Sequence, residues 1–267
     1  ETADTASGEP PKALIVPHAG YIYSGPVAAT AYHTLLANRD KISRVVLLGP
    51  AHRVYLRGMA LSRATAFATP LGTIPVARDA VSLIQALPQV AAGDNAYNGE
   101  HSLEVHLPFL QTVLGEFELL PLLVGDCPAE QVAEVLQMLW GGEETLIVIS
   151  SDLSHFHDYA TARQKDTATA DHIQSLRLEE IGPYEACGCM PINGLLHIAR
   201  QEQLRVELLD LRSSGDTAAS RDSVVGYGSF AVYPAATDYE QSDRERLLRL
   251  ARDSIEYGLA TGSPLQP

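Results

Sequence analysis

Three histidines follow short apolar runs of the chain and lie in polar loops. His18 comes after the run ALIV, His52 after VVLL and His155 after LIVI. When such runs form parallel strands, their carboxyl ends meet at one edge of the sheet, where α/β proteins bind ligands. Imidazole is a ligand for zinc, copper and iron. A single histidine after a strand is more often a hydrogen-bonded loop residue, but three equivalent loops together predict one shared site.

Cys187 is a fourth candidate, because it stands just before a predicted helix at 191–202. Exposed N–H groups at a helix start favour the thiolate, so we expect a lowered pKa and a thiol that can bind a metal. A buried structural cysteine is the ordinary alternative for a lone thiol. Cys187 and Cys189 form a CxC pair, which lacks the paired CxxC spacing of a zinc ribbon.

The segment 99–111 carries two more histidines, but it is not an HExxH zinc-protease motif. On a helix, His106 shares a face with Leu103 and Leu110, which predicts core packing. His101 stands near the start of that helix, where it can contact a substrate or support a ligand. The chain has no glycine-rich nucleotide loop and no GxSxG motif. Their absence argues against a nucleotide-binding protein and against an α/β-hydrolase.

The elements that must position these residues alternate between strands and helices. Nearly continuous apolar runs predict strands that are covered on both faces, and longer segments between them have helical periodicity. We therefore predict an α/β fold, with a central, mostly parallel or mixed sheet and helices on both faces. The strands are expected at 13–16, 45–48, 119–124, 146–149 and, with an antiparallel orientation as one option, 224–233; the helices are expected at 26–38, 77–87, 101–114, 129–140, 160–176 and 191–202.

Composition narrows the partners and the compartment. The net charge is -14 with only 19 Lys and Arg residues, which argues against binding to nucleic acid. No apolar run approaches the roughly 20 residues that span a bilayer, so we expect no membrane partner. The segment 1–11 does not have the pattern of a signal peptide. Three cysteines do not suggest a disulfide framework, so a reducing, cytoplasmic compartment is expected.

Eight segments together resemble the Memo family in the order in which they occur, across roughly residues 12–234. The resemblance implies the fold of class III extradiol dioxygenases. The segments are PHAGYIYSG (17–25), LLGPAHRVY (47–55), ATPLG (68–72), GEHSLEVHLPFLQ (99–111), PLLVGD (121–126), VISSDLSHFHDY (148–159), ACGCMPI (186–192) and YGSFAVYP (227–234).

The resemblance also implies roles for individual residues. His18, His52 and Cys187 match the positions of the family's metal ligands, and Cys187 is preferred over Cys189 because it precedes the glycine of the CGxxPI motif. Two histidines with one anionic ligand resemble the facial triad of non-haem iron oxygenases, with a thiolate in place of the carboxylate. Fe(II) is the favoured ion, while the softer thiolate keeps Cu(I) and zinc in competition.

A dioxygenase-like oxidoreductase with a small-molecule substrate is the activity that this resemblance favours. His155 would then act as the acid or base, and Asp152 would orient it or a bound water. Tyr21 and His101 are the candidates for substrate contact or for support of the ligands. One alternative is a non-enzymatic module that binds a peptide or small ligand in the same pocket. A second alternative is a metal-dependent hydrolase, which the scarcity of clustered acids disfavours.

The C-terminal part of the chain has a different pattern. Residues 242–258 predict an amphipathic helix with a capping box at its start. The stretch 247–265 resembles the opening of an AMMECR-type domain, which implies that domain as a partner in the full-length chain and a radical SAM protein as an associated one, as in the AmmeMemoRadiSam system. We therefore predict domains at 12–234 and 235–267. A C-terminal helix that packs on the first domain is the alternative.

Overall fold

A computed structural model describes residues 10–217 and 220–235 and six residues of the C-terminal segment. The chain divides into two units, Glu1–Pro234 and Ala235–Pro267. Part of the helix predicted at 242–258 lies outside the described residues, and the AMMECR-type identity of this segment stays a prediction. Its six described residues are helical and exposed, and they are Arg246, Leu248, Arg249, Arg252, Ser254 and Ile255.

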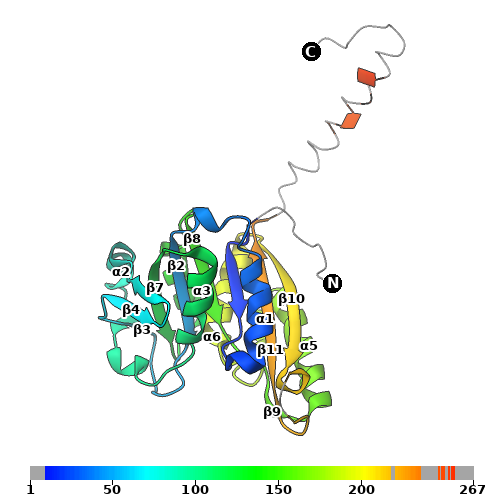
Figure 1. The fold of residues 1–267 in the computed structure, drawn as a ribbon, viewed down its shortest axis with the longest axis horizontal. Coiled ribbons are helices and arrows are strands. Elements are labelled where there is room, and N and C mark those ends of the chain that lie inside the picture. Colours follow the sequence, from blue (N-terminus) through cyan, green and yellow to red (C-terminus); the bar gives the residue numbers. More distant parts are fainter. Residues whose placement is uncertain are drawn as a thin grey trace. The chain divides into compact units, whose positions relative to one another are not determined.

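The described part of the first unit is built on a mixed sheet (Figure 1). Its strands are β1 (Ala13–Val16), β2 (Arg44–Pro50), β3 (Met59–Leu61), β6 (Val90–Ala92), β7 (Glu118–Val124), β8 (Thr145–Ser150), β9 (His155–His157), β10 (Arg205–Ser213) and β11 (Val224–Tyr233). The order across the sheet is β10-β11-β1-β8-β2-β7-β3-β6, and β9 pairs with β11 off this path. Two further strands, β4 (Ala66–Thr69) and β5 (Gly72–Pro75), form a separate antiparallel hairpin.

The centre of the sheet is parallel and its flanks are mixed. β1 and β2 both run parallel to β8, which lies between them, and β7 runs parallel to β2. β11 is antiparallel to β1 and to β10. The four predicted apolar strands and the antiparallel last strand are therefore confirmed. Because β1 and β2 lie on either side of β8, the loops that follow these three strands meet at one edge of the sheet.

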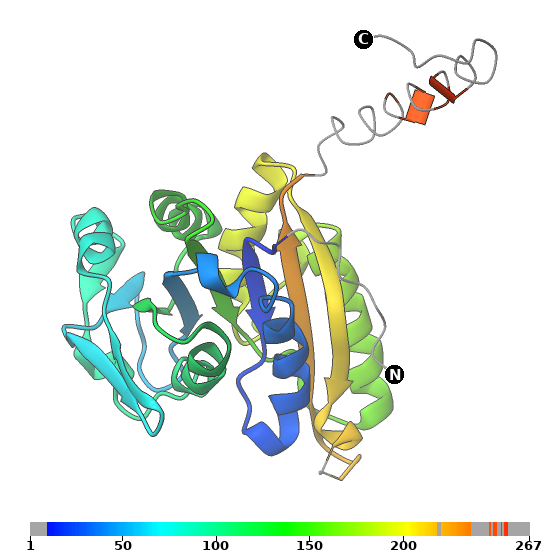
Figure 2. The same ribbon diagram turned by 45° about the horizontal axis from the view of Figure 1, so that its top comes forward.

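Helices cover both faces of the sheet (Figures 1 and 2). Alternate side chains of each strand point to opposite faces, and the buried apolar side chains accordingly form two clusters. One cluster joins the sheet to α1 and α3, and the other joins it to α2, α4, α5 and α6. The helices are α1 (Tyr21–His33), α2 (Arg78–Ile84), α3 (Leu107–Leu114), α4 (Ala129–Met138), α5 (Tyr159–Gln174) and α6 (Cys189–Gln201).

Two predicted helix starts are wrong, and proline is involved in both. The helix predicted from residue 26 begins at Tyr21, so Pro26 lies inside α1. Pro26 is exposed, so water can satisfy the carbonyl that its missing N–H leaves free. The helix predicted from residue 101 begins at Leu107, after a short 3-10 turn, and Pro108 occupies its first turn, where no N–H is needed.

Several strands were not predicted from the sequence. β3, β6 and β9 have only three residues each, and β4 and β5 are mostly half-buried or exposed, so none of them has the buried apolar run of four residues that predicted β1. β10 has nine residues, but most of its side chains are only partly buried, so it lacks the apolar run of the central strands.

Within the part of the chain that the structure describes, no helix is long and apolar enough to cross a membrane.

Candidate metal centre

The structure brings together the three predicted metal ligands, which we call the triad: His18, His52 and Cys187. One donor atom of each residue lies within 4.8 Å of the others. His18 Nε2 is 3.6 Å from Cys187 Sγ, and the centroids of the two imidazole rings are 5.3 Å apart. His18 follows β1, His52 follows β2, and Cys187 stands two residues before α6 begins. Two imidazoles and one sulfur within this distance fit a single transition-metal ion.

His18 is held by a chain of buried hydrogen bonds. Its Nδ1 is 2.6 Å from Ser150 Oγ, and that hydroxyl donates to the carbonyl of Ser102 at 2.5 Å. Since the hydroxyl hydrogen is used there, Nδ1 must carry the proton and Nε2 is left with a free lone pair. Burial, followed by the nearby His52, lowers the pKa of His18 to about 3. The ring is therefore neutral, which is the form that binds a metal.

His52 is held by the carboxylate of Glu100. His52 Nδ1 lies 3.0 Å from Glu100 Oε1, and the backbone N–H of His52 donates to Oε2 at 2.6 Å. The backbone N–H groups of His101 and Ser102 both donate to Oε1 at 2.9 Å. Burial of Glu100 would raise its pKa, but the hydrogen bonds from His52 and Ser102 lower it to about 2. Glu100 is thus ionised and directs Nε2 of His52 away from itself.

Glu100 lies in one of the segments that resemble the family, but its role was not predicted from the sequence. Its signal in the sequence is weak: an acidic residue next to His101, 48 positions from the histidine that it supports. A carboxylate that pairs with a metal-binding histidine is a recurrent outer partner in metal sites. The pairing only becomes visible once the loop after β2 and the 99–102 turn lie side by side.

Cys187 departs from its predicted ionisation. Burial, and then the charge of Asp152, raise the pKa of this thiol to about 12, so the expected lowered pKa is wrong. The reason is that α6 begins only at Cys189, and burial outweighs the single backbone N–H of Asp152 that reaches Sγ at 3.3 Å. Binding of a metal cation is what would make this thiol ionise. Cys189 is buried within the apolar core, so Cys187 is the thiol that belongs to the triad.

Asp152 lies directly beside the triad. Its carboxylate is buried and accepts the backbone N–H of His18 at 2.8 Å. Burial raises the pKa of Asp152 to about 6, although the hydrogen bond from His18 and the charge of His155 act in the opposite direction. His155, on β9, is half-buried and close enough to influence the pKa of both Asp152 and His18. The two residues predicted for acid–base chemistry therefore adjoin the predicted ligands.

The backbone at Phe156 separates His155 from His157. Phe156 has a φ of 61°, in the left-handed region that a bulky residue rarely adopts, and β9 shifts its register against β11 at this point. His157 is half-buried and interacts with Asp166 rather than with Asp152. His157 therefore lies apart from the triad.

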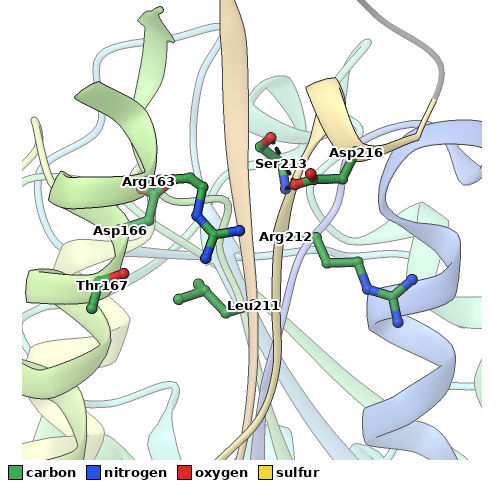
Figure 3. Close-up of a pocket in the computed structure, with 7 residues that line it drawn as sticks. All are labelled: Arg163, Asp166, Thr167, Leu211, Arg212, Ser213 and Asp216. Carbon is green, nitrogen blue, oxygen red and sulfur yellow. Dashed lines mark hydrogen bonds between the residues drawn. The ribbon is translucent and has the colours of Figure 1, made fainter. Parts of the chain in front are cut away.

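Asp166 borders a small cavity between α5 and β10, shown in Figure 3. The cavity has a volume of only about 10 Å³, which is room for one water molecule at most. Asp166 packs so closely on the backbone of Gly226 that a Cβ there would lie 2.0 Å from Oδ2. This carboxylate therefore has a structural role, since it also accepts the backbone N–H of Ser154 at 3.0 Å.

A larger groove, of about 520 Å³, lies between the β4–β5 hairpin and the starts of α1 and α3. We call it the hairpin groove. Gly20 and Glu100, which line it, belong to the segments that carry or support the histidine ligands. Its volume is typical of small-molecule sites. Its lining is mainly apolar and aromatic, and consists of Gly20, Tyr21, Phe67, Ala68, Thr69, Pro70, Tyr97, Glu100, Leu103, Glu104, Val105, Leu107, Pro108 and Leu123.

The remaining candidate residues have different surroundings. Tyr21 lines the hairpin groove and donates its hydroxyl to the carbonyl of Val105 at 3.1 Å. The His101 side chain is 62% exposed and pairs with Glu104 at 2.6 Å, outside the triad. His106 is buried, and its Nδ1 lies 2.9 Å from the hydroxyl of Tyr32, as its predicted core position requires.

Comparisons with known proteins found similarity to one family. A family model described as Memo-like protein matches residues 2–231. A MEMO1 family protein of Sulfolobus acidocaldarius is 34% identical over 80% of each chain. One from Methanosarcina acetivorans is 35% identical over 82% of this chain and 84% of its own. An uncharacterized protein of Escherichia coli K12 has a solved structure that is similar with a TM-score of 0.49, at 14% identity, over 82% of this chain and 98% of that one.

Proposed function

The chain belongs to the Memo-like protein family, and from that premise we propose that it is a metal-dependent oxidoreductase that acts on a small organic molecule. The triad is the observation that carries this proposal. Two imidazoles with free Nε2 lone pairs and one thiol, all within 4.8 Å, provide a complete three-donor set. Asp152 and His155 add titratable groups beside it.

The donor set favours a transition metal. Three donors leave other coordination positions open, as in the two-histidine, one-carboxylate sites of Fe(II) oxygenases. Fe(II) is therefore the ion that we favour, and Cu(I) and zinc are the competitors because sulfur replaces the carboxylate. When bound, such an ion would supply a Lewis acid and open positions for substrate binding.

The protein side chains supply the proton chemistry and the orientation. We assign His155 to accept a proton from a substrate hydroxyl, because histidine is the side chain that most often serves as a general base. The buried carboxylate of Asp152 interacts electrostatically with His155 and also holds the backbone of His18. Asp152 thus contacts a ligand and lies close to the base.

The hairpin groove is the site that we assign to the body of the substrate. Its apolar and aromatic lining favours an apolar ring or chain. Glu104 adds negative charge to its wall, and the chain as a whole carries a net charge of -14, so a neutral or cationic molecule is favoured over an anionic one.

A ligand-binding module without turnover is the second candidate. It is favoured by the start of α1, where 50% of Tyr21 and 68% of Ile22 is exposed beside the ligand loop of His18. Exposed apolar side chains at a concave site are typical of binding surfaces. In this case the metal would stabilise the loops, and the partner would be a peptide or small ligand.

Metal analysis combined with oxygen consumption distinguishes the two candidates. Protein purified without oxygen should contain one metal ion per chain, and catechol-like compounds should change its absorbance and consume O₂. His155→Ala should keep the metal but lose turnover, whereas the matched variant His157→Ala should keep both. Metal-loaded protein that binds such compounds without consuming O₂ would support the binding module. Loss of metal from His155→Ala would make that residue a ligand instead.

The partners and the compartment are proposed from the family resemblance. We propose that an AMMECR-type domain follows residue 235 in the full-length protein and that a radical SAM protein acts with it, in the cytoplasm. Co-purification of the full-length protein with a radical SAM protein from the same organism would support this association. Absence of the association at micromolar concentrations would argue against it.

A further inference from the structure

Glu100 supports only one of the two histidine ligands, and that ligand is the more exposed one. The His52 side chain is 41% exposed, while the side chain of Glu100 is 3% exposed. Neighbouring side chains enclose the exposed His52 ring less than the half-buried His18. The hydrogen bond from His52 Nδ1 to Glu100, at 3.0 Å, is therefore the contact that determines the orientation of the ring.

The carboxylate of Glu100 is itself held rigidly. It accepts four hydrogen bonds, from Nδ1 and the backbone N–H of His52 and from the backbone N–H groups of His101 and Ser102. A carboxylate with four fixed donors cannot rotate. The 100–102 turn therefore fixes the carboxylate, and the carboxylate fixes the ring of His52. Ser102 also accepts the hydroxyl of Ser150, which supports His18, so this turn connects both histidines.

The support of His18 is neutral, since its Nδ1 meets the hydroxyl of Ser150. The support of His52 is an ionised carboxylate. Glu100 consequently adds a negative charge, one imidazole ring away from the metal position. The attraction between that charge and a bound ion grows in proportion to the ionic charge. The same carboxylate therefore stabilises a divalent ion more than a monovalent one.

We propose that Glu100 is a positioning residue that directs Nε2 of His52 into the triad and shifts the affinity of the site towards a divalent ion relative to Cu(I). This inference rests on the proposed metal site, but it does not depend on any reaction at that site. It predicts the tautomer of His52 before a metal binds, and it predicts how two ions of different charge respond to loss of the carboxylate.

The first test needs no variant. Nitrogen NMR of the metal-free wild-type protein should find His52 protonated at Nδ1 and unprotonated at Nε2. A proton on Nε2 of His52 would overturn the proposal, because the hydrogen bond to Glu100 would then not set the tautomer.

The second test measures the binding of Co(II) and of Cu(I), each alone and without oxygen, to wild type and Glu100→Gln. The Kd for Co(II) should rise roughly 10- to 100-fold, the usual range for loss of an outer partner. The Kd for Cu(I) should rise by a smaller factor, since the electrostatic part of the loss scales with the ionic charge. The visible spectrum of the Co(II) complex should also change, because the His52 ring is less constrained.

Glu104→Gln is the matched control. Glu104 also accepts a hydrogen bond from a histidine Nδ1, that of His101 at 2.6 Å, but this histidine lies outside the triad. Both Kd values should therefore stay at the wild-type level. Equal losses for Co(II) and Cu(I) in Glu100→Gln, or none, would overturn the proposal. If wild type binds neither ion, the proposed metal site fails; if it binds both but catalyses nothing, only the proposed activity fails.

Discussion

His18 and His52 follow strands on either side of β8, in loops of similar composition, yet they are held in different ways. His18 is half-buried, hydrogen-bonded to a neutral hydroxyl and supported through its backbone by Asp152. His52 is 41% exposed and depends on the carboxylate of Glu100. We call these the closed side and the open side of the triad. The closed side provides rigidity through packing, while the open side provides access and needs a charged partner to keep its ligand in place.

Substitution of the ligands should have the largest effect and should separate the two sides. His18→Ala and His52→Ala should each weaken metal binding by more than the roughly 100-fold expected for loss of an outer partner. Without metal, His18→Ala should also lose about 2 kcal/mol of stability, because it removes the hydrogen bond to Ser150 and leaves a cavity at a half-buried position. His52→Ala should stay within about 1 kcal/mol of wild type.

Isothermal calorimetry with Fe(II) or Co(II) and chemical unfolding would measure these effects. A variant in which His18, His52 and Cys187 are all replaced shows how much metal binding remains when the triad is absent. If that variant bound the metal as tightly as wild type, the assignment of the triad would be wrong. If the two single variants lost equal stability, the distinction between a closed and an open side would lose its basis.

Low pH should destabilise the folded protein on the closed side of the triad. The residue responsible is His106, which interacts electrostatically with His18. Burial, and then His18, lower the pKa of His106 from 6.5 to about 3. Between these values the unfolded chain binds a proton that the folded protein does not, so stability falls as the pH drops from 6.5 towards 3. One such proton contributes about 1.4 kcal/mol per pH unit.

Between pH 6 and 4, the His106→Gln variant should take up about one proton fewer on unfolding than the wild type does. The number of protons follows from the slope of the free energy of unfolding against pH, measured by urea unfolding at several pH values. Glutamine retains a hydrogen-bonding group for Tyr32 but cannot titrate in this range. Tyr32→Phe is the control, since it keeps His106 buried and should retain most of the pH dependence. An unchanged slope in His106→Gln would show that His106 is protonated in the folded protein.

Gly188 tests the packing beneath the closed side. A Cβ at this position would lie 2.5 Å from the carbonyl oxygen of Ser150 and 2.7 Å from Cβ of Ser151. Gly188→Ala should therefore cost roughly 1–3 kcal/mol and weaken metal binding, because the backbone around Cys187 must move. Gly20→Ala is the matched control near His18, since its nearest contact would be a Tyr23 carbon at 3.8 Å. It should change stability by less than about 0.5 kcal/mol.

Deletion of residues 235–267 should have the smallest effect, because this segment is a separate unit of the chain. Both sides of the triad belong to the first unit, so metal affinity should not change, and stability should change by less than about 0.5 kcal/mol. Self-association can change, since the helix predicted at 242–258 has an apolar stripe. A loss of several degrees in the melting temperature would mean that this helix contributes to the core of the first unit, contrary to the two-domain prediction.

The sequence by itself was sufficient to predict the central strands and the polar loops at their ends. The apolar runs of β1, β2, β7 and β8 predict buried strands because local composition determines whether a segment can be covered on both faces. The loops after β1, β2 and β8 carry polar residues that such strands cannot accommodate. A shared edge of the sheet then follows from the parallel arrangement, and with it the grouping of His18, His52 and His155.

Only the tertiary structure decided how those residues are supported and ionised. Glu100 meets His52 across 48 positions of the chain, and Cys187 meets His18 across 169. Contacts at this separation depend on the order of the strands, which no local pattern encodes. The raised pKa of Cys187 has the same origin, because burial is a property of the packed protein and outweighs the helix start that the local sequence suggests.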